Sequence, residues 1–351
     1  MQTAPRIAAI ATAVPPFLLD QAAVMQRARH LFAGAEDLER LLPVFANTGI
    51  RRRYSAVPLD WFEQPHHWPE RNGLYLTAAV SLLEAAARQA LGQANLSPAD
   101  IGAIVVVSTT GIATPSLDAL LIERLTLPPT VQRLPIFGLG CAGGAIGLAR
   151  AATLAAAIPD KAVLFLVVEL CSLTFRRDDQ TKSNIVGAAL FGDGAAALVL
   201  RCDGNGPAVT AGGEHTWPQT LDVMGWEVTG DGLKPIFSRD IPRLVVQRLG
   251  DAARDFLARQ GLTLDDVDRF VCHPGGPKVI DACALALQTD PAALDNARAV
   301  LRDFGNMSAA SVLFVLDRML AEDGGDPCWQ RALLTALGPG FTAGFVVLRR
   351  G

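Results

Sequence analysis

The sequence predicts an α/β protein of two similar halves, residues 1–203 and 204–351, related by an approximate twofold axis. Two observations indicate this fold. Apolar, strand-like runs alternate with helical stretches along the whole chain. In addition, several segments of the first half recur in the second half in the same order, which is typical of an internal duplication.

The strands give the clearest copies. An acidic lead-in at residues 96–101 precedes an apolar strand at 103–107, and a similar lead-in at 262–267 precedes a strand at 269–273. Apolar runs such as residues 162–168 predict strands buried on both faces. Such strands are typical of a mostly parallel sheet with helices on either side, so we expect that arrangement here.

The helices and final turns repeat as well. Amphipathic helices are expected before the paired strands, over residues 74–91 and 244–260. Helices that open in small residues follow them, at 141–145 and 305–310. Each half then closes on a Gly-x-Gly turn and an apolar strand, at 192–201 and 338–349.

Composition limits the possible functions. The chain has 351 residues, half of them hydrophobic, which is enough for a large core and suggests two domains. The net charge is −4 and the longest arginine run has three residues, so we expect no nucleic-acid partner. The six cysteines form no CxxC or CxxH pair, which predicts reduced thiols of a cytoplasmic protein and no metal site. We expect neither a signal peptide nor an apolar run of transmembrane length.

Cys141 is the strongest candidate for chemistry. It lies between a strand-like run and an Ala-rich helical run at residues 145–157. The first turn of a helix presents unpaired N–H groups and the positive end of the dipole, which favour the nucleophilic thiolate. Glycines at 140, 143 and 144 leave room for a substrate carbonyl. The alternative is that Cys141 is only a small buried hydrophobic residue.

The duplication gives Cys141 two partners. It places Asn306 at the equivalent helix start, and His273 ends the strand that is paired with residues 103–107. His273 can hold the thiolate as an ion pair or donate to an oxyanion, and Asn306 can add a second donor. The alternatives are a structural histidine and an ordinary N-cap asparagine.

This trio predicts acyl transfer rather than hydrolysis. No Gly-x-Ser-x-Gly elbow occurs, and no carboxylate is obviously placed to activate water. A cysteine with two hydrogen-bond donors suits transfer from a thioester, followed by stabilisation of an enolate. Malonyl decarboxylation needs such an enolate site and no metal.

Six motifs resemble those of the type III polyketide synthases, the chalcone synthase-like family. They stand at residues 48–54, 140–144, 191–196, 273–277, 305–310 and 338–342, and the resemblance runs from about residue 7 to 349. The ketoacyl synthase III enzymes share Cys-His-Asn. The Gly-Gly-Pro after His273 and the Gly-Pro-Gly at 338–340 are typical of the polyketide branch.

The resemblance implies a thiolase-like, five-layered αβαβα fold and a homodimer. It also implies iterative decarboxylative condensation of malonyl-CoA onto an acyl-CoA starter. Cys141 would hold the starter and the growing chain, while His273 and Asn306 bind the thioester carbonyl and stabilise the enolate. The CoA thioesters are substrates, and no cofactor is expected.

Further site residues follow from the same resemblance. Phe191 matches a gatekeeper between the CoA tunnel and the cavity, with an ordinary core role as the alternative. Small residues match cavity-lining positions, with simple packing as the alternative: Thr110, Thr174, Gly187 and Ser308. Thr114, before Pro115, matches a loop that reaches into the partner's cavity. The residues expected to meet CoA are Arg40, Gly275, Gly276 and Lys278.

Two departures from the plant members of the family are visible. Pro43 and Asn47 stand where those enzymes have cations, and their second gatekeeper aromatic is replaced near residues 235–237.

Threonines at 110, 114 and 174 suggest a roomy cavity, and residues 61–72 resemble bacterial members. The chain most resembles alkylresorcinol and alkylpyrone synthases, which take long fatty acyl-CoA starters. One alternative is a single condensation like that of ketoacyl synthase III, on an acyl-carrier protein. The other is a non-catalytic binding protein with a structural cysteine.

Overall fold

The computed structural model describes residues 4–34, 38–322 and 329–350. Two of our expectations concern residues outside these ranges. They are the N-terminal segment without a signal peptide, of which residues 1–3 are not described, and the sixth cysteine, Cys328. The described residues form one sheet of nine strands in the order β11-β12-β13-β8-β1-β7-β6-β4-β5. The strands are β1 (Arg6–Ala13), β4 (Ile101–Val107), β5 (Gln132–Ile136), β6 (Ala162–Leu170), β7 (Asp193–Arg201), β8 (Ala208–Thr216), β11 (Arg269–Cys272), β12 (Arg331–Gly338) and β13 (Thr342–Arg349).

The strand order is symmetric about the junction of β1 and β8, which meet at Arg6 and Ala208. Reading outward, β1, β7, β6 and β4 correspond to β8, β13, β12 and β11. The short helices η2 (Pro98–Asp100) and η5 (Leu264–Asp266) precede β4 and β11, and both begin with a capping box. The repeated sequence segments thus occupy corresponding places, while the boundary after residue 203 remains a prediction.

The sheet is mixed, so the prediction of a mostly parallel sheet is wrong. β4 pairs in parallel with β5 and β6, and β11 pairs in parallel with β12. In contrast, β6–β7, β7–β1, β12–β13 and β13–β8 are antiparallel. An apolar run such as that of β6 shows that both faces are covered, but it carries no information on the direction of its neighbours.

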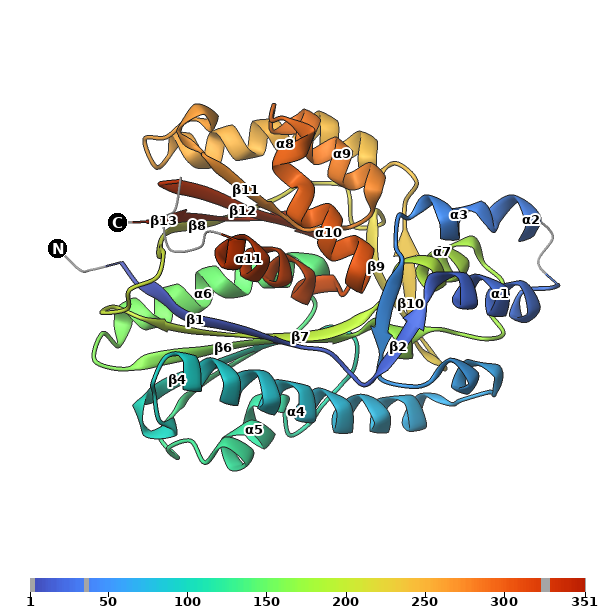
Figure 1. The fold of residues 1–351 in the computed structure, drawn as a ribbon, viewed down its shortest axis with the longest axis horizontal. Helices are drawn as coiled ribbons and strands as arrows, with labels where there is room; N and C mark the ends of the chain where they lie inside the picture. Colours follow the sequence, from blue (N-terminus) through green and yellow to red (C-terminus); the bar gives the residue numbers. More distant parts are fainter. Residues whose placement is uncertain (1–3, 35–37, 323–328, 351) are drawn as a thin grey trace.

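Helices and sheet form five layers (Figure 1). α4 (Trp68–Gln93) and α5 (Leu117–Leu125) cover the outer face of the β1-to-β5 half. α6 (Gly143–Ala157) and α11 (Ser311–Glu322) lie between the two halves of the sheet. α8 (Ile241–Ala258), α9 (Pro277–Ala286) and α10 (Asp295–Phe304) cover the other outer side. This αβαβα order confirms the predicted fold class, and α4 and α8 contain most of the two predicted amphipathic helices.

A smaller group of elements lies beside the layers, at one end of the molecule (Figure 1). It includes β2 (Phe17–Asp20), α1 (Gln21–Leu31), α2 (Leu38–Leu41), α3 (Pro43–Asn47), β3 (Arg52–Ser55), η1 (Leu59–Glu63), η4 (Cys171–Thr174), α7 (Lys182–Leu190), β9 (Met224–Thr229) and β10 (Gly232–Phe237). These elements surround the cavities described below.

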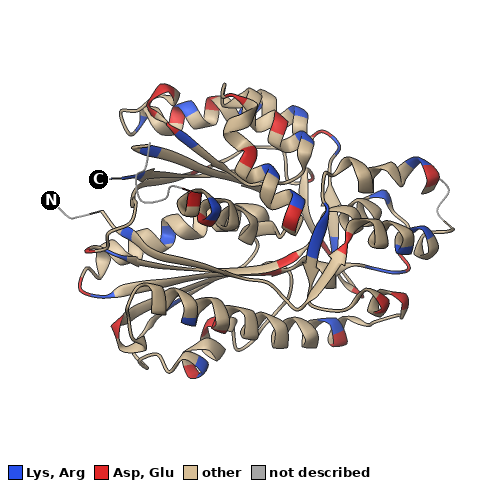
Figure 2. Ribbon diagram, viewed as in Figure 1, with Lys and Arg blue, Asp and Glu red and all other residues tan. Residues whose placement is uncertain are grey.

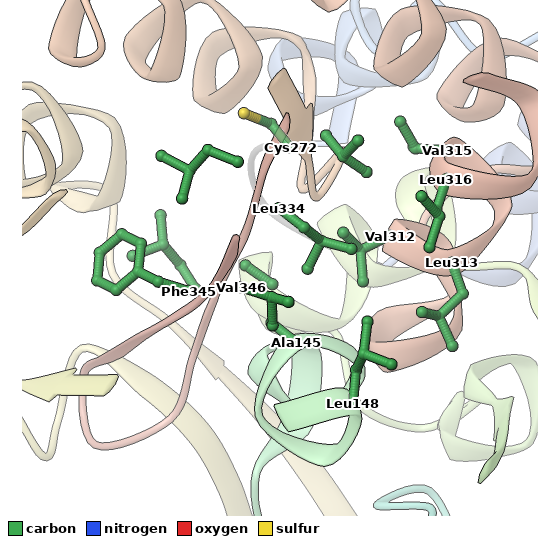
Figure 3. Packing of buried hydrophobic residues seen from close by; sticks show 14 of the residues in the cluster. Ala145, Leu148, Cys272, Val312, Leu313, Val315, Leu316, Leu334, Phe345 and Val346 are labelled. Carbon is green, nitrogen blue, oxygen red and sulfur yellow. The ribbon is translucent and has the colours of Figure 1, made fainter. Parts of the chain in front are cut away.

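The middle layer is the densest part of the core. Figure 3 shows side chains of α6 and α11 packed against β12 and β13, with Leu148, Leu313 and Phe345 among them. Gly144 brings the two helices together, because a Cβ there would lie 2.4 Å from the Ala309 carbonyl oxygen. Charged residues lie mainly on the outer helices and loops (Figure 2).

One segment departs from our expectation about membrane spans. Residues Gly140–Ala157 are, by length and composition alone, long and apolar enough to cross a membrane. In the fold, 67% of this segment is buried, as expected for a core helix between two sheets.

Candidate active site

Cys141, His273 and Asn306 line one cavity of about 430 Å³. Cys141 lies in the short helix η3 (Gly140–Ala142) just before α6, and His273 directly follows β11. Asn306 lies between α10 and the short helix η7 (Ser308–Ala310). The structure therefore brings together the three residues that the sequence singled out, and we call this space the Cys141 cavity.

Cys141 is 9% exposed, and its Sγ donates to Ser308 Oγ at 3.6 Å. Burial raises the pKa of the thiol to about 12; the hydrogen bond with Ser308 opposes this rise, and the charge of Glu169 reinforces it. The prediction of a lowered pKa at a helix start is therefore wrong for the free structure. The loss of water around the thiolate outweighs the favourable helix end.

His273 is buried, and burial lowers its pKa to about 3. The imidazole is therefore neutral near neutral pH, which argues against an ion pair with Cys141. Among the described residues, neither Nδ1 nor Nε2 has a hydrogen-bond partner. Buried polar groups are nearly always paired, so these two nitrogens at the wall of a cavity indicate a ligand site.

Asn306 has both a structural contact and a free hydrogen-bonding face. Its Oδ1 accepts from the Ser308 backbone N–H at 2.8 Å, but the N-cap of η7 is Met307, so Asn306 is not the N-cap that we considered as an alternative. Its Nδ2 donates to the Gly275 carbonyl at 3.3 Å. These two bonds fix the amide so that Nδ2 faces Gly275, which lines the cavity. By element order, the counterpart of the Cys141 turn is η7, which Asn306 precedes by two residues.

Glu169, near the end of β6, was missed by the sequence argument. Its Oε2 accepts from the Thr109 N–H at 3.0 Å and from Thr110 Oγ1 at 2.9 Å. Burial raises its pKa to about 8, while its hydrogen bonds, Thr109 first, act in the opposite direction. The available signal was a single charged residue in an otherwise apolar strand, AVLFLVVEL.

Phe191 lines the Cys141 cavity and also a second, apolar pocket of about 60 Å³. Thr174 and Gly187 line the second pocket, together with aliphatic and aromatic side chains of α1 and η1. Phe237 lies against Phe191, with 5.6 Å between ring centroids, and lines the Cys141 cavity. Phe191 is thus the shared wall of two spaces, and its role as a gatekeeper remains a prediction.

Two predicted lining residues lie elsewhere. Thr110 is buried and bonded to Glu169 and to the Leu170 N–H, so it supports the site from behind. Ser308 contacts Cys141 but is absent from the residues that line the described cavities. Thr114 is exposed, and its peptide bond to Pro115 is cis. The described spaces beside Phe191 include the Cys141 cavity of about 430 Å³ and the pocket of about 60 Å³, and the roomy cavity that we expected from the threonines remains a prediction.

The residues predicted to meet CoA all line the Cys141 cavity: Arg40, Gly275, Gly276 and Lys278. Lys182 and Arg239 line it as well, although the sequence argument missed both. Among the described lining residues there are four cations and no acidic side chain. Because Lys182 and Arg239 come from separate segments, only the folded chain places them beside Arg40 and Lys278.

Comparison with known proteins identifies the family. Residues 3–204 match the model of the N-terminal domain of chalcone and stilbene synthases, and residues 209–350 match that of the C-terminal domain. The chain is 39% identical to a putative chalcone synthase of Bacillus subtilis, over 96% of each protein. It is 40% identical to a 1,3,6,8-tetrahydroxynaphthalene synthase of Streptomyces peucetius, over 98% of this chain and 92% of that protein.

A solved structure agrees with these matches. The 1,3,6,8-tetrahydroxynaphthalene synthase of Streptomyces coelicolor, a bacterial type III polyketide synthase, superposes with a TM-score of 0.94 at 31% identity. The superposition covers 98% of this chain and 99% of that one. The chain therefore belongs to the chalcone and stilbene synthase family of type III polyketide synthases, acyltransferases that condense malonyl-CoA with an acyl-CoA starter.

Proposed function

We propose that this enzyme extends a fatty acyl-CoA starter repeatedly with malonyl-CoA and cyclises the product to an alkylpyrone or alkylresorcinol. The observation that carries the proposal is the joint placement of Cys141, His273 and Asn306 around one cavity with four cations in its wall. A thiol, a neutral imidazole and an amide supply what thioester transfer and enolate stabilisation need.

In the loading step, the neutral imidazole of His273 accepts the Cys141 proton as the starter thioester arrives. The thiolate attacks the thioester carbonyl, the bond to the CoA sulfur breaks, and CoA leaves as a thiol with that proton. The acyl group is then held on Cys141 as a new thioester. Because His273 takes the proton only when the starter is present, Cys141 does not have to be a thiolate in its buried position beforehand.

In the extension step, malonyl-CoA loses carbon dioxide and leaves an enolate. His273 and Asn306 donate hydrogen bonds to the enolate oxygen, each contributing about 3–4 kcal/mol. The enolate carbon attacks the acyl group on Cys141, and the thiolate is released for the next cycle.

The cations in the cavity wall support a CoA thioester as substrate. Arg40, Lys182, Arg239 and Lys278 are all exposed and come from four different segments. Phosphate groups are bound by such clusters of Lys and Arg. The lining residues therefore fit a substrate with an apolar or acyl end at Cys141 and phosphates at the other end.

The apolar pocket behind Phe191 supports an alkyl starter. Its wall includes Leu19, Leu31 and Phe62, and it is separated from the Cys141 cavity by Phe191. Its volume of about 60 Å³ means that a long tail must displace side chains of the wall. A second candidate is synthesis of tetrahydroxynaphthalene, which has no alkyl chain; the 40% identity to such a synthase favours it.

We also propose a homodimer. The loop around the cis Thr114–Pro115 bond is exposed, and Ile112 beside it is 50% exposed. Phe137, four residues before Cys141, is 59% exposed. Their burial against a second copy would remove this apolar surface from water, in line with the dimer that the family resemblance implies. A monomer in analytical ultracentrifugation at micromolar concentration would contradict this.

The experiment is incubation of the purified enzyme with malonyl-CoA and acyl-CoA starters of two to eighteen carbons, with products read by mass spectrometry. Pyrones or resorcinols that carry the starter's alkyl chain support the proposal. Tetrahydroxynaphthalene from malonyl-CoA alone would support the second candidate. A single extension without a ring would instead indicate chemistry like that of ketoacyl synthase III.

Substitutions test the roles of the three residues. Cys141→Ala is expected to make no product, because no thioester can form; full-length polyketide from this variant would refute the mechanism. His273→Ala and Asn306→Ala are each expected to lower malonyl decarboxylation by about 100-fold or more. Undiminished carbon dioxide release from either variant would remove that residue from the enolate site.

A further inference from the structure

We propose that Arg53, a buried arginine on β3, is a positioning residue that holds the Phe191 turn and the Asn306 turn in fixed relation to each other. This inference rests on the proposed function, in which Asn306 binds the enolate and Phe191 separates two spaces. β3 lies outside the nine-stranded sheet, and Arg53 is 3% exposed.

Arg53 fixes the end of α7 through backbone carbonyls. Its Nη1 donates to the Ala188 oxygen at 2.8 Å and to the Phe191 oxygen at 2.9 Å. The last carbonyls of a helix lack partners within the helix, so a side chain that binds them determines where the helix ends. In this chain, the residue at that end is Phe191.

The same side chain packs on the turn before Asn306. A Cβ built on Gly192 would lie 3.3 Å from the Arg53 Cβ, and one built on Gly305 would lie 3.5 Å from it. Both glycines thus lie next to the stem of Arg53, with room for no more than a van der Waals contact between a side chain there and the stem. Gly305 has a φ of 72°, which favours glycine, so the turn cannot easily take a side chain that would replace this contact.

Backbone hydrogen bonds join the two turns directly. The Gly192 N–H donates to the Asn306 oxygen at 3.0 Å, and the Asn306 N–H donates to the Leu190 oxygen at 2.8 Å. Phe191 and Asn306 are therefore paired as in a short parallel bridge. A shift of the Phe191 turn therefore moves the Asn306 turn. Arg53 is hydrogen-bonded to the Phe191 turn and packs beside both turns.

Gln21 anchors the arginine from the far side. Its Oε1 accepts from Arg53 Nη2, and its Nε2 donates to the Phe45 and Ala189 oxygens, each at 3.0 Å. Burial lowers the pKa of Arg53 to about 10, and the nearby Asp193 opposes that shift. The guanidinium remains charged near neutral pH, and a planar fork reaches several carbonyls at once, which a lysine ammonium does less well.

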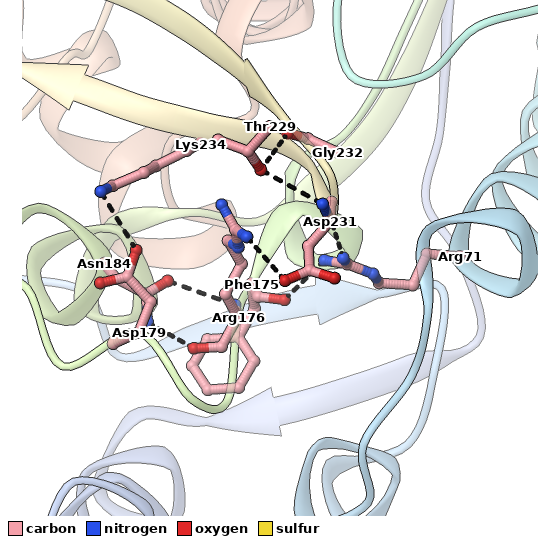
Figure 4. Close-up of polar contacts among 9 residues, drawn as sticks. All are labelled: Arg71, Phe175, Arg176, Asp179, Asn184, Thr229, Asp231, Gly232 and Lys234. Atoms are coloured by element: carbon pink, nitrogen blue, oxygen red, sulfur yellow. Dashed lines mark hydrogen bonds and ion pairs between the residues drawn. The ribbon is translucent and has the colours of Figure 1, made fainter.

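The test compares Arg53→Met with Arg71→Met. Arg71 is a matched control: it is 4% exposed and donates to two backbone carbonyls, those of Phe175 and Asp231 (Figure 4). Both substitutions remove a buried arginine, so both should lower thermal stability. Neither of these hydrogen bonds of Arg71 reaches the Phe191 turn or the Asn306 turn.

Carbon dioxide release from malonyl-CoA and acylation of Cys141 are measured at a temperature where all variants are folded. Arg53→Met is expected to lower kcat for carbon dioxide release by at least about tenfold, since a shift of an oxyanion donor by a fraction of an ångström is costly. The kcat of Arg71→Met should stay within about twofold of wild type. The kcat of Arg53→Lys should fall between those of wild type and Arg53→Met, because the ammonium keeps the charge but lacks the planar fork.

Equal kcat in folded Arg53→Met and Arg71→Met would overturn the proposal, since Arg53 would then serve stability alone. If Arg53→Met does not fold, Gln21→Met provides the test, because it leaves both carbonyl bonds of Arg53 but removes their anchor. Gln21→Met with wild-type kcat would refute the inference. Failure of the wild-type enzyme to release carbon dioxide would instead refute the proposed function.

Discussion

The tight packing of Gly144 in α6 against η7 and α11 offers a sharp test of how the fold positions the site. A Cβ added at Gly144 would lie 2.4 Å from the Ala309 oxygen and 2.5 Å from Val312 Cγ1. Ordinary contacts of these kinds need roughly 3.3–4.0 Å. Gly144→Ala therefore forces η7 and α11 away from α6 by about 1 Å, because a backbone carbonyl has no rotamer that relieves the clash.

Overpacking of this kind costs about 1–3 kcal/mol, and the better helix propensity of Ala returns at most about 1 kcal/mol. We expect a net loss of about 1–2 kcal/mol in the free energy of unfolding. The shift also displaces Ser308 and Asn306 relative to Cys141, since all three are attached to these two helix starts. A displacement of 1 Å between reacting groups lowers rates by about 100-fold, so activity should fall further than stability.

Gly73→Ala is the matched control. Gly73 is exposed in the interior of α4, and nothing lies within 4 Å of the position of its added Cβ. It should raise the free energy of unfolding by about 0.5–1 kcal/mol and leave product formation unchanged. Urea denaturation and initial rates of product formation measure both effects. Wild-type stability and rate in Gly144→Ala would refute the argument that this contact sets the spacing of the site.

Three further predictions concern charge. Burial raises the pKa of Glu169 to about 8 from 4.5, so the folded state keeps a proton that the unfolded chain loses, and stability falls as pH rises through that interval. Glu169→Gln should remove this slope from urea midpoints, and a pH-independent difference from wild type would contradict it. Because burial raises the pKa of Cys141, iodoacetamide should modify it ever faster up to at least pH 9. A plateau below pH 7 would show that the helix start and His273 outweigh burial. Lys278→Gln should raise KM for malonyl-CoA about fivefold or more but leave KM for the malonyl thioester of N-acetylcysteamine, which lacks phosphates, unchanged. Equal effects on both substrates would exclude a phosphate contact.

The sequence was sufficient to recognise much of the site. Cys141, His273 and Asn306 stand out because each follows a strand or opens a helix within a repeated pattern, and the structure places them around one cavity. Local patterns carry this information because helix starts and strand ends are set by nearby residues.

The roles of Glu169 and Arg53 could not be predicted from local sequence patterns. Glu169 was hidden because its partners, Thr109 and Thr110, lie about sixty residues earlier in the chain. The link between Arg53 and Phe191 spans 138 residues and ends on a backbone carbonyl, which every residue possesses. Contacts between distant residues that end on a backbone group cannot be inferred from the residue types.

The sequence by itself determined the duplicated α/β organisation, the family and the candidate trio Cys141, His273 and Asn306, because apolar periodicity and short motifs reflect local rules. Only the tertiary structure decided the mixed direction of the strands, the raised pKa of Cys141 and the neutral state of His273. The physical reason is burial. How much water a thiol or an imidazole keeps depends on segments from the whole chain, and the desolvation that results outweighs the favourable helix end at Cys141.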